Sequence, residues 1–194
     1  MILDNALAVS SGEKSMEMLT EMLIQASVLR VSAAKTGAEA RSFVLRADAT
    51  DFELCVINTP LGDEFGDALA RDIAANSTSE VILLVKSEIF EDVSAKAGEH
   101  GILTVSKPIN KALFWNAVKM AQAAHRRLQI VRRENKRLQQ KIEDIRVIDR
   151  AKCMLIAYLS MSEPEAHKYI ERQAMDTRVT RRAVAEDILK TYES

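Results

Sequence analysis

The side chains in this sequence that could do chemistry gather near its C-terminal end, and they are of types that bind rather than catalyse. Lysine and arginine contact phosphates, amide side chains hydrogen-bond to polar edges, and flat aromatic rings stack on bases. Each type also has a plainer role: Arg181 could merely solvate its helix, and Tyr169 could belong to a core. The candidate binding residues are Lys152, Tyr158, Lys168, Arg172, Gln173, Arg178, Arg181 and Arg182.

The charge distribution singles out the same region. Residues 1–125 contain 11 Lys and Arg and 17 Asp and Glu, for a net charge of −6, whereas residues 126–194 contain 16 and 11, for a net charge of +5. Because a phosphate backbone is repelled by the first part and attracted by the second, we expect a polyanion to bind at the C-terminal end. Charge alone leaves open that the basic residues only solvate a long exposed helix.

Other kinds of site are disfavoured by the residue types and their spacing. Cys55 and Cys153 have no partner at metal or redox spacing, so we expect two buried free thiols. The histidines His100, His125 and His167 lie far apart, so we expect no metal and no cofactor. No set of nucleophile and base indicates an enzyme. Without a long apolar run or a signal peptide, we expect a cytoplasmic protein that does not bind membranes.

Short apolar runs alternate with helical stretches in the first half of the chain. The candidate strands cover residues 6–9, 28–31, 54–57, 81–85 and 102–105. Between them apolar residues recur with helical spacing, as at Leu19, Met22 and Leu23. Strands that alternate with helices predict a parallel sheet covered on both faces, which is a doubly wound α/β domain.

This order of elements resembles the receiver domains of bacterial response regulators, over roughly residues 5–123. The resemblance rests on residues 36–40 after the second strand, on Gly66 eight residues after Asn58, and on Lys107-Pro108 directly after the fifth strand. It implies a flavodoxin-like fold, and it places Ser10, Ser11, Asn58 and Lys107 at the positions of the phosphorylation site.

The residues at these positions depart from those of a working receiver. A receiver needs an acidic pair after its first strand to hold magnesium, and an aspartate after its third strand to accept the phosphoryl group. Ser10-Ser11 and Asn58 stand there instead, and an amide cannot act as the anionic nucleophile. Val85-Lys86 replaces the hydroxyl residue usual after the fourth strand. We therefore expect a pseudo-receiver domain that is not phosphorylated.

Two details at this site remain open from the sequence. Lys107 could hydrogen-bond to Asn58 or to a strand-end carbonyl, or it could be an ordinary surface lysine. Glu13, Asp63 and Glu64 lie close enough in the sequence to leave weak metal binding as an alternative.

No glycine or proline interrupts the chain between Lys111 and Glu163, which predicts one helix from about Ala112 to Leu159. A helix of about 45 residues is on the order of 70 Å long, more than one small domain covers. We therefore expect a homodimer through a coiled coil; the alternative is that the stripe packs on the chain's own receiver-like domain. The predicted seam, with the a/d spacing of a left-handed coiled coil, consists of Leu128, Val131, Asn135, Leu138, Ile142 and Ile145.

Residues 146–194 predict the end of that helix and two shorter helices. Ser162 and Glu165 form a capping box before the second helix, and Thr180 can cap the third. This segment closely resembles the ANTAR domain, the RNA-binding module of bacterial transcription antitermination regulators. The matching motifs are Ile148-Asp149-Arg150-Ala151-Lys152 with Leu155, Ser162-Glu163-Pro164-Glu165-Ala166, Arg172-Gln173-Ala174-Met175-Asp176, and Ala183-Val184-Ala185 with Ile188-Leu189.

The resemblance implies binding to small stem-loops, often in tandem, in the leader of a nascent transcript, which prevents an intrinsic terminator from forming. We expect a receiver-like domain over residues 1–123, a coiled-coil linker helix over 124–147 and an ANTAR domain over 148–194. Control would come from a ligand or a partner, such as a sensor protein bound to the receiver-like domain. Two alternatives remain open: a DNA-binding response regulator, and a protein-interaction adaptor whose basic end is incidental.

Overall fold

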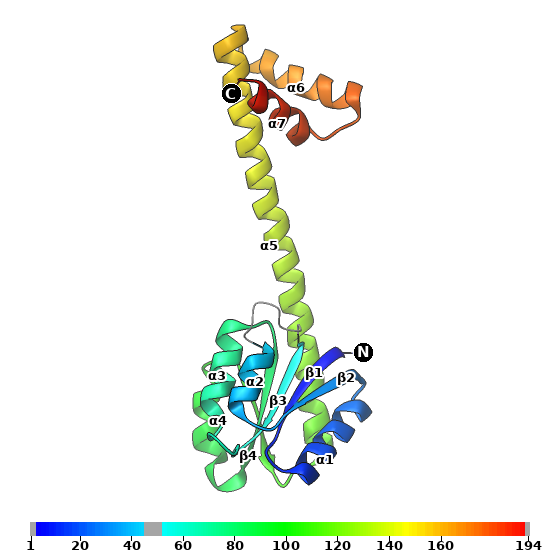
Figure 1. Ribbon diagram of the computed structural model, residues 1–194, viewed down its shortest axis with the longest axis vertical. Helices are drawn as coiled ribbons and strands as arrows, with labels where there is room; N and C mark the ends of the chain where they lie inside the picture. The colour runs from blue at the N-terminus through cyan, green and yellow to red at the C-terminus, as the bar shows by residue number, and fades with distance from the viewer. Residues whose placement is uncertain (1–2, 45–51, 193–194) are drawn as a thin grey trace. The chain divides into compact units, whose positions relative to one another are not determined.

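The computed structural model describes residues 3–44 and 52–192 of the chain. An α/β region comes first, and one long helix and two short helices follow it (Figure 1). The chain divides into two compact units, Met1–Gln129 and Ile130–Ser194. The long helix α5 (Lys111–Leu159) contributes to both units.

The first unit is built on a parallel sheet with strand order β2-β1-β3-β4-β5. This confirms the predicted doubly wound, receiver-like fold. The strands are β1 (Leu3–Val9), β2 (Val28–Ala34), β3 (Leu54–Asn58), β4 (Glu80–Lys86) and β5 (Leu103–Lys107). The helices of this unit are α1 (Glu13–Gln25), α2 (Gly37–Val44), α3 (Asp67–Asn76), the short 3-10 turn η1 (Ser87–Ile89), α4 (Phe90–Gly98) and the first part of α5.

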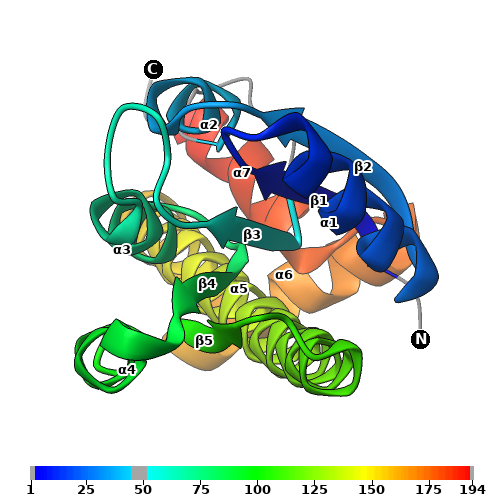
Figure 2. The same ribbon diagram turned by 90° about the horizontal axis from the view of Figure 1, so that it is seen from below.

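Helices cover both faces of this sheet, as Figure 2 shows. Alternate residues of a strand point to opposite faces, so Cys55 and Ile57 of β3 pack towards α2, α3 and α4. Leu54 and Val56 pack on the other face, together with buried residues of α1 and α5 such as Phe114. Burial on both faces explains why β3 and β4 read as continuous apolar runs in the sequence.

The second unit is a bundle of the last part of α5 with α6 (Glu163–Thr177) and α7 (Arg181–Tyr192). Its core includes Leu155 of α5, Ile170 of α6 and Ala185 of α7. The predicted caps are present. The Ser162 backbone N–H donates to Glu165 Oε2 at 2.8 Å, and the Ala183 N–H donates to Thr180 Oγ1 at 3.2 Å. The bundle therefore follows the predicted order of helices.

The two cysteines, both expected to be buried, differ in their exposure. Cys55 is buried as predicted, and burial raises the pKa of its thiol to about 12. Cys153 is exposed, so the prediction that both thiols are buried was wrong for this residue, because it lies on a side of α5 that does not face the bundle core. Within residues 3–44 and 52–192, no helix is both long and apolar enough to span a membrane.

Candidate functional site

The carboxyl ends of β1, β3 and β5 bring together three of the four residues at the degenerate phosphorylation positions. Asn58 ends β3, Ser10 directly follows β1, and Lys107 ends β5. Asn58 Nδ2 donates to Ser10 Oγ at 3.0 Å, and Lys107 Nζ donates to Asn58 Oδ1 at 3.0 Å and to the Thr59 carbonyl. Ser11 is exposed. Lys107 therefore hydrogen-bonds to both Asn58 and a strand-end carbonyl, and it is not an ordinary surface lysine.

The electrostatics of this cluster are unlike those of a magnesium site. Ser10 is buried and neutral, and both ends of the Asn58 amide already have hydrogen-bond partners. Partial burial lowers the pKa of Lys107 below its usual value, and the positive charge of Lys86, its partner in the β4–β5 register, lowers this pKa further. In the described part of the chain, no three His, Cys, Asp or Glu residues are grouped so as to hold a metal ion.

The nearby carboxylates of the loop after β3 are bound to α2. The Asp63 carboxylate accepts hydrogen bonds from the backbone N–H groups of Gly37 and Ala38 at 2.9 and 3.1 Å, and these bonds lower the pKa of Asp63. A helix N-terminus favours such a negative charge. Glu64 forms an ion pair with Arg41. Both acids therefore attach the loop to α2, where they already have partners.

The predicted coiled-coil seam runs along an exposed side of α5. All six side chains are exposed, and those of Val131, Ile142 and Ile145 are each more than half exposed. Charged pairs flank the seam, such as Arg137 with Glu134 at 2.7 Å. An exposed apolar stripe of this length is unusual for a solvated helix, and a second helix could cover it.

Three of the predicted binding residues hold the helices of the bundle together. Lys152 Nζ lies 2.8 Å from carboxylate oxygens of Asp149 and Glu163, which raises its pKa. Arg181 pairs with Glu171 at 3.0 Å. These two cations join α6 to α5 and to α7 respectively. Arg182 of α7 also lies 2.8 Å from Asp144 of α5 and 2.7 Å from Glu186.

The other predicted binding cations are exposed and, within the described ranges, are not held by close carboxylate partners. Arg172 is exposed and only loosely paired with Asp176, at 3.7 Å. Lys168, one turn earlier on α6, is exposed, as is Arg178, which ends α6 in a left-handed conformation with φ 56°. Among the described residues, neither Lys168 nor Arg178 forms an ion pair.

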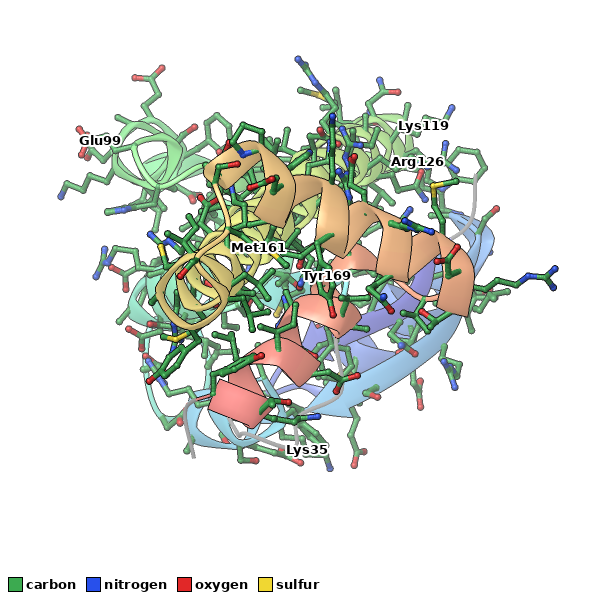
Figure 3. The ribbon with its side chains drawn as sticks, turned by 90° about the horizontal axis from the view of Figure 1, so that it is seen from above. Lys35, Glu99, Lys119, Arg126, Met161 and Tyr169 are labelled. Carbon is green, nitrogen blue, oxygen red and sulfur yellow. The ribbon has the colours of Figure 1, made fainter. Side chains whose placement is uncertain are left out.

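The polar and aromatic candidates occupy different environments. Gln173 is half-buried on α6. Tyr158 is exposed and stacks on Tyr192, with ring centroids 5.1 Å apart. Tyr169 on α6 (Figure 3) is 37% exposed, so it lies at the edge of the bundle rather than in its core. The sequence could not distinguish the cations that link helices from the others, because the carboxylates Glu163, Glu171 and Asp144 come from other helices.

Comparison with known proteins relates the C-terminal part of the chain to a domain family and most of the chain to a known regulator. Residues 136–189 match the model of the ANTAR domain family. The chain is 28% identical over 174 residues to the transcriptional regulatory protein PdtaR from Mycobacterium tuberculosis, an alignment that covers 89% of this chain and 83% of that protein.

Part of the chain also resembles solved structures, among them a receiver domain. The signal receiver domain of an HD domain-containing protein from Pseudomonas fluorescens Pf-5 matches with a TM-score of 0.57 and 20% identity, over 66% of this chain and 93% of that one. An adenylate cyclase structure from Rhodopirellula baltica matches with a TM-score of 0.60 and 14% identity, over 71% and 98%. Both likenesses show the fold alone. The chain therefore carries an ANTAR domain behind a receiver-like domain, and it is homologous to the transcriptional regulator PdtaR.

Proposed function

We propose that this chain is an RNA-binding transcription antitermination regulator that acts as a dimer on stem-loops in nascent leader transcripts. The observation that carries the proposal is the ANTAR match over residues 136–189. The relation to PdtaR supports a regulatory role rather than an enzymatic one. We assign residues 1–123 to the receiver-like domain, 124–147 to the linker helix and 148–194 to the RNA-binding domain.

The exposed side of α6 is the best starting point for the RNA surface. Lys168 and Arg172 lie one turn apart and Arg178 follows at the end of the helix, so the three cations can reach successive phosphates of a folded RNA. The turn between α6 and α7 borders an open depression of about 530 Å³, lined in part by Met175 and Val179. An unstacked loop base needs such a partly apolar surface beside the cations.

The paired cations contribute to this surface in a second way. Lys152, Arg181 and Arg182 are held by carboxylates that are themselves partly exposed, so their side chains are fixed in place before any RNA arrives. A fixed side chain loses less conformational freedom on binding. Replacing one of them should therefore lower both the stability of the bundle and its affinity for RNA. Replacing Arg172 should lower only the affinity.

Control of the regulator would not involve aspartyl phosphorylation. The Ser10–Asn58–Lys107 cluster provides no anionic nucleophile, and its hydrogen bonds link the ends of three strands. A ligand or a sensor protein acting on the receiver-like domain would supply the signal. The exposed seam on α5 supports dimerisation of two such chains.

The direct test is binding to RNA and DNA of matched length. The full-length chain should bind a stem-loop from the leader next to its own gene more tightly than a duplex DNA, and its affinity should fall steeply as salt rises. Arg172→Ala should weaken RNA binding by about 1–3 kcal/mol with unchanged helical content. Lys190→Ala, a charge change of the same size at an exposed position of α7, serves as the control and should bind normally.

Loop and stem substitutions decide between specific and general binding. Changing loop bases should reduce the affinity, whereas swapping base pairs in the stem should not, because the narrow groove of an A-form stem hides the base edges. Equal affinity for the hairpin and the DNA duplex would contradict the proposal and favour a DNA-binding regulator or an adaptor.

A further inference from the structure

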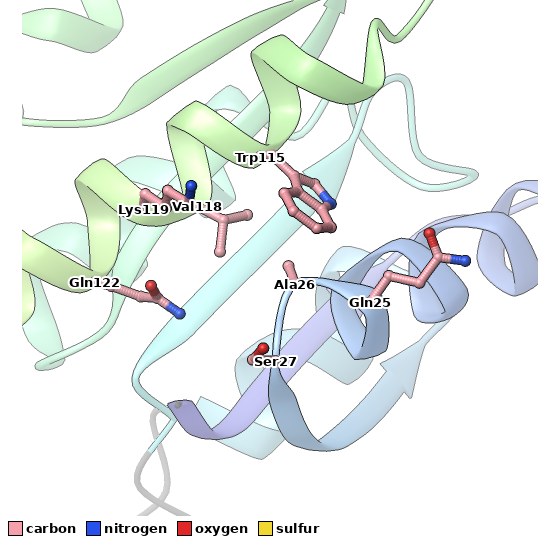
Figure 4. A pocket seen from close by; sticks show the side chains of 7 residues that line it. All are labelled: Gln25, Ala26, Ser27, Trp115, Val118, Lys119 and Gln122. Atoms are coloured by element: carbon pink, nitrogen blue, oxygen red, sulfur yellow. The ribbon is translucent and has the colours of Figure 1, made fainter. Parts of the chain in front are cut away.

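A cavity of about 370 Å³ lies in the first unit between the end of α1 and the first turns of α5 (Figure 4). Gln25, Ala26 and Ser27 line it from the α1 side. The α5 side consists of Trp115, Val118, Lys119 and Gln122, whose spacing places all four on one side of the helix. The volume is within the range of small-molecule sites, roughly 300–1,000 Å³. None of the lining residues belongs to the Ser10–Asn58–Lys107 cluster.

A buried polar group without a hydrogen-bond partner lies beside this cavity. The Gln122 side chain is only 4% exposed, and its Nε2 has no hydrogen-bond partner. Figure 4 shows the Gln122 amide directed from α5 towards the turn at Ser27, on the side where the cavity lies. A buried amide donor without a partner is rare in folded proteins, because leaving it unpaired costs the free energy of its lost hydration. A small turn of the Gln122 amide towards the cavity would let an acceptor atom on a bound molecule remove this cost.

The remaining walls of the cavity define the chemistry of that molecule. Trp115 and Val118 provide a flat apolar surface, and Trp115 is 41% exposed, so a ring could pack on the part of it that is open. The Lys119 ammonium lies 5.9 Å from the centre of the Trp115 ring. The α5 side of the cavity thus offers a positive charge, an amide group and an aromatic face.

We propose that this cavity binds a small planar aromatic carboxylate. The ring of the ligand lies against Trp115 and Val118, and its carboxylate accepts a hydrogen bond from Gln122 Nε2 and pairs with Lys119. A carboxylate is favoured over a neutral carbonyl because, among the described residues, the only charged side chain that lines the cavity is Lys119. The inference does not depend on RNA binding, and RNA-binding variants of the second unit leave it unchanged.

The test uses the full-length chain and its single tryptophan, Trp115, whose fluorescence reports directly on the cavity. The probes are benzoate and nicotinate, with benzyl alcohol as a ring without charge and acetate as a charge without a ring. We expect saturable changes in Trp115 emission with both aromatic carboxylates, at least tenfold weaker binding of benzyl alcohol, and no saturable change with acetate. Absence of saturation with both aromatic carboxylates overturns the proposal.

Variants separate a ligand site from a packing defect. Gln122→Leu removes the unpaired donor, so it should keep or raise the thermal stability of the first unit while weakening benzoate binding about tenfold or more. Lys119→Met should weaken benzoate but not benzyl alcohol. Lys14→Met, an exposed lysine on α1 outside the cavity, is the matched control and should bind like the unmodified chain. Unchanged benzoate affinity in Gln122→Leu and Lys119→Met overturns the proposal.

Discussion

At the scale of single residues, Ser10, Asn58 and Lys107 form a chain of hydrogen bonds across the carboxyl edge of the sheet. That Lys107 contacts Asn58 was one of the alternatives, and the structure confirms it. That Ser10 completes the chain of hydrogen bonds was not foreseen. Its role depends on how β1 and β3 are placed side by side, which brings together residues 48 positions apart. Local sequence patterns carry no information about such a pairing.

The first prediction at this scale concerns phosphoryl transfer. When the full-length chain is incubated with Mg²⁺ and a small phosphodonor, its intact mass should remain unchanged, because Asn58 offers an amide where an anionic nucleophile is required. Asn58→Asp should also remain largely unmodified, since Ser10 and Ser11 give a magnesium ion no negative charge. A stoichiometric phosphoryl adduct on the unmodified chain contradicts this account.

The second residue-scale prediction concerns stability. Asn58→Leu removes the acceptor of Lys107 Nζ and the donor to the buried Ser10, and it should lower the free energy of unfolding by about 1–3 kcal/mol. Denaturation followed by Trp115 fluorescence measures this change, because Trp115 lies in the same unit. Ser11→Ala alters an exposed hydroxyl and should shift stability by less than about 0.5 kcal/mol. Equal effects of the two substitutions would show that the cluster has no structural role.

At the scale of elements, the sequence predicted the order of strands and helices better than their limits. The expected strand at 28–31 extends in the structure to Ala34, because β2 pairs with β1 along its whole length although residues 32–34 are small or polar. Pairing rather than hydrophobicity sets that boundary. In the second unit the capping box fixed the start of α6 correctly, because its hydrogen bonds are local.

The seam on α5 gives the prediction at this scale. Leu138→Glu combined with Ile142→Glu places charges in the middle of the apolar stripe and should convert a dimer into monomers in sedimentation experiments at micromolar concentration. Arg133→Glu also alters charge on an exposed part of α5 but lies outside the a/d positions, so it should leave the dimer intact. A monomeric unmodified chain, or a dimer unaffected by the double substitution, would mean that the seam does not hold two chains together.

At the scale of the whole molecule, the acidic and basic parts of the sequence belong to two units of different architecture, one α/β and one helical. The acidic part forms the receiver-like domain, and the basic part carries the ANTAR match. Charge and motif could be read from the sequence. The division of the basic residues into paired and unpaired ones could not, because partners such as Asp144 for Arg182 come from different helices. The cavity beside Gln122 was missed for the same reason, since two elements far apart in sequence enclose it.

The most direct measurement is transcription through the terminator in the leader next to the gene, with purified RNA polymerase and the full-length chain. If the chain binds nascent stem-loops, adding it should raise the fraction of full-length transcript, and Lys168→Ala combined with Arg172→Ala should reduce this effect while Lys190→Ala does not. Mutating the loop bases of the leader hairpins should abolish the effect on the unmodified chain. Readthrough that stays constant as the unmodified chain is added would contradict the proposed antitermination function.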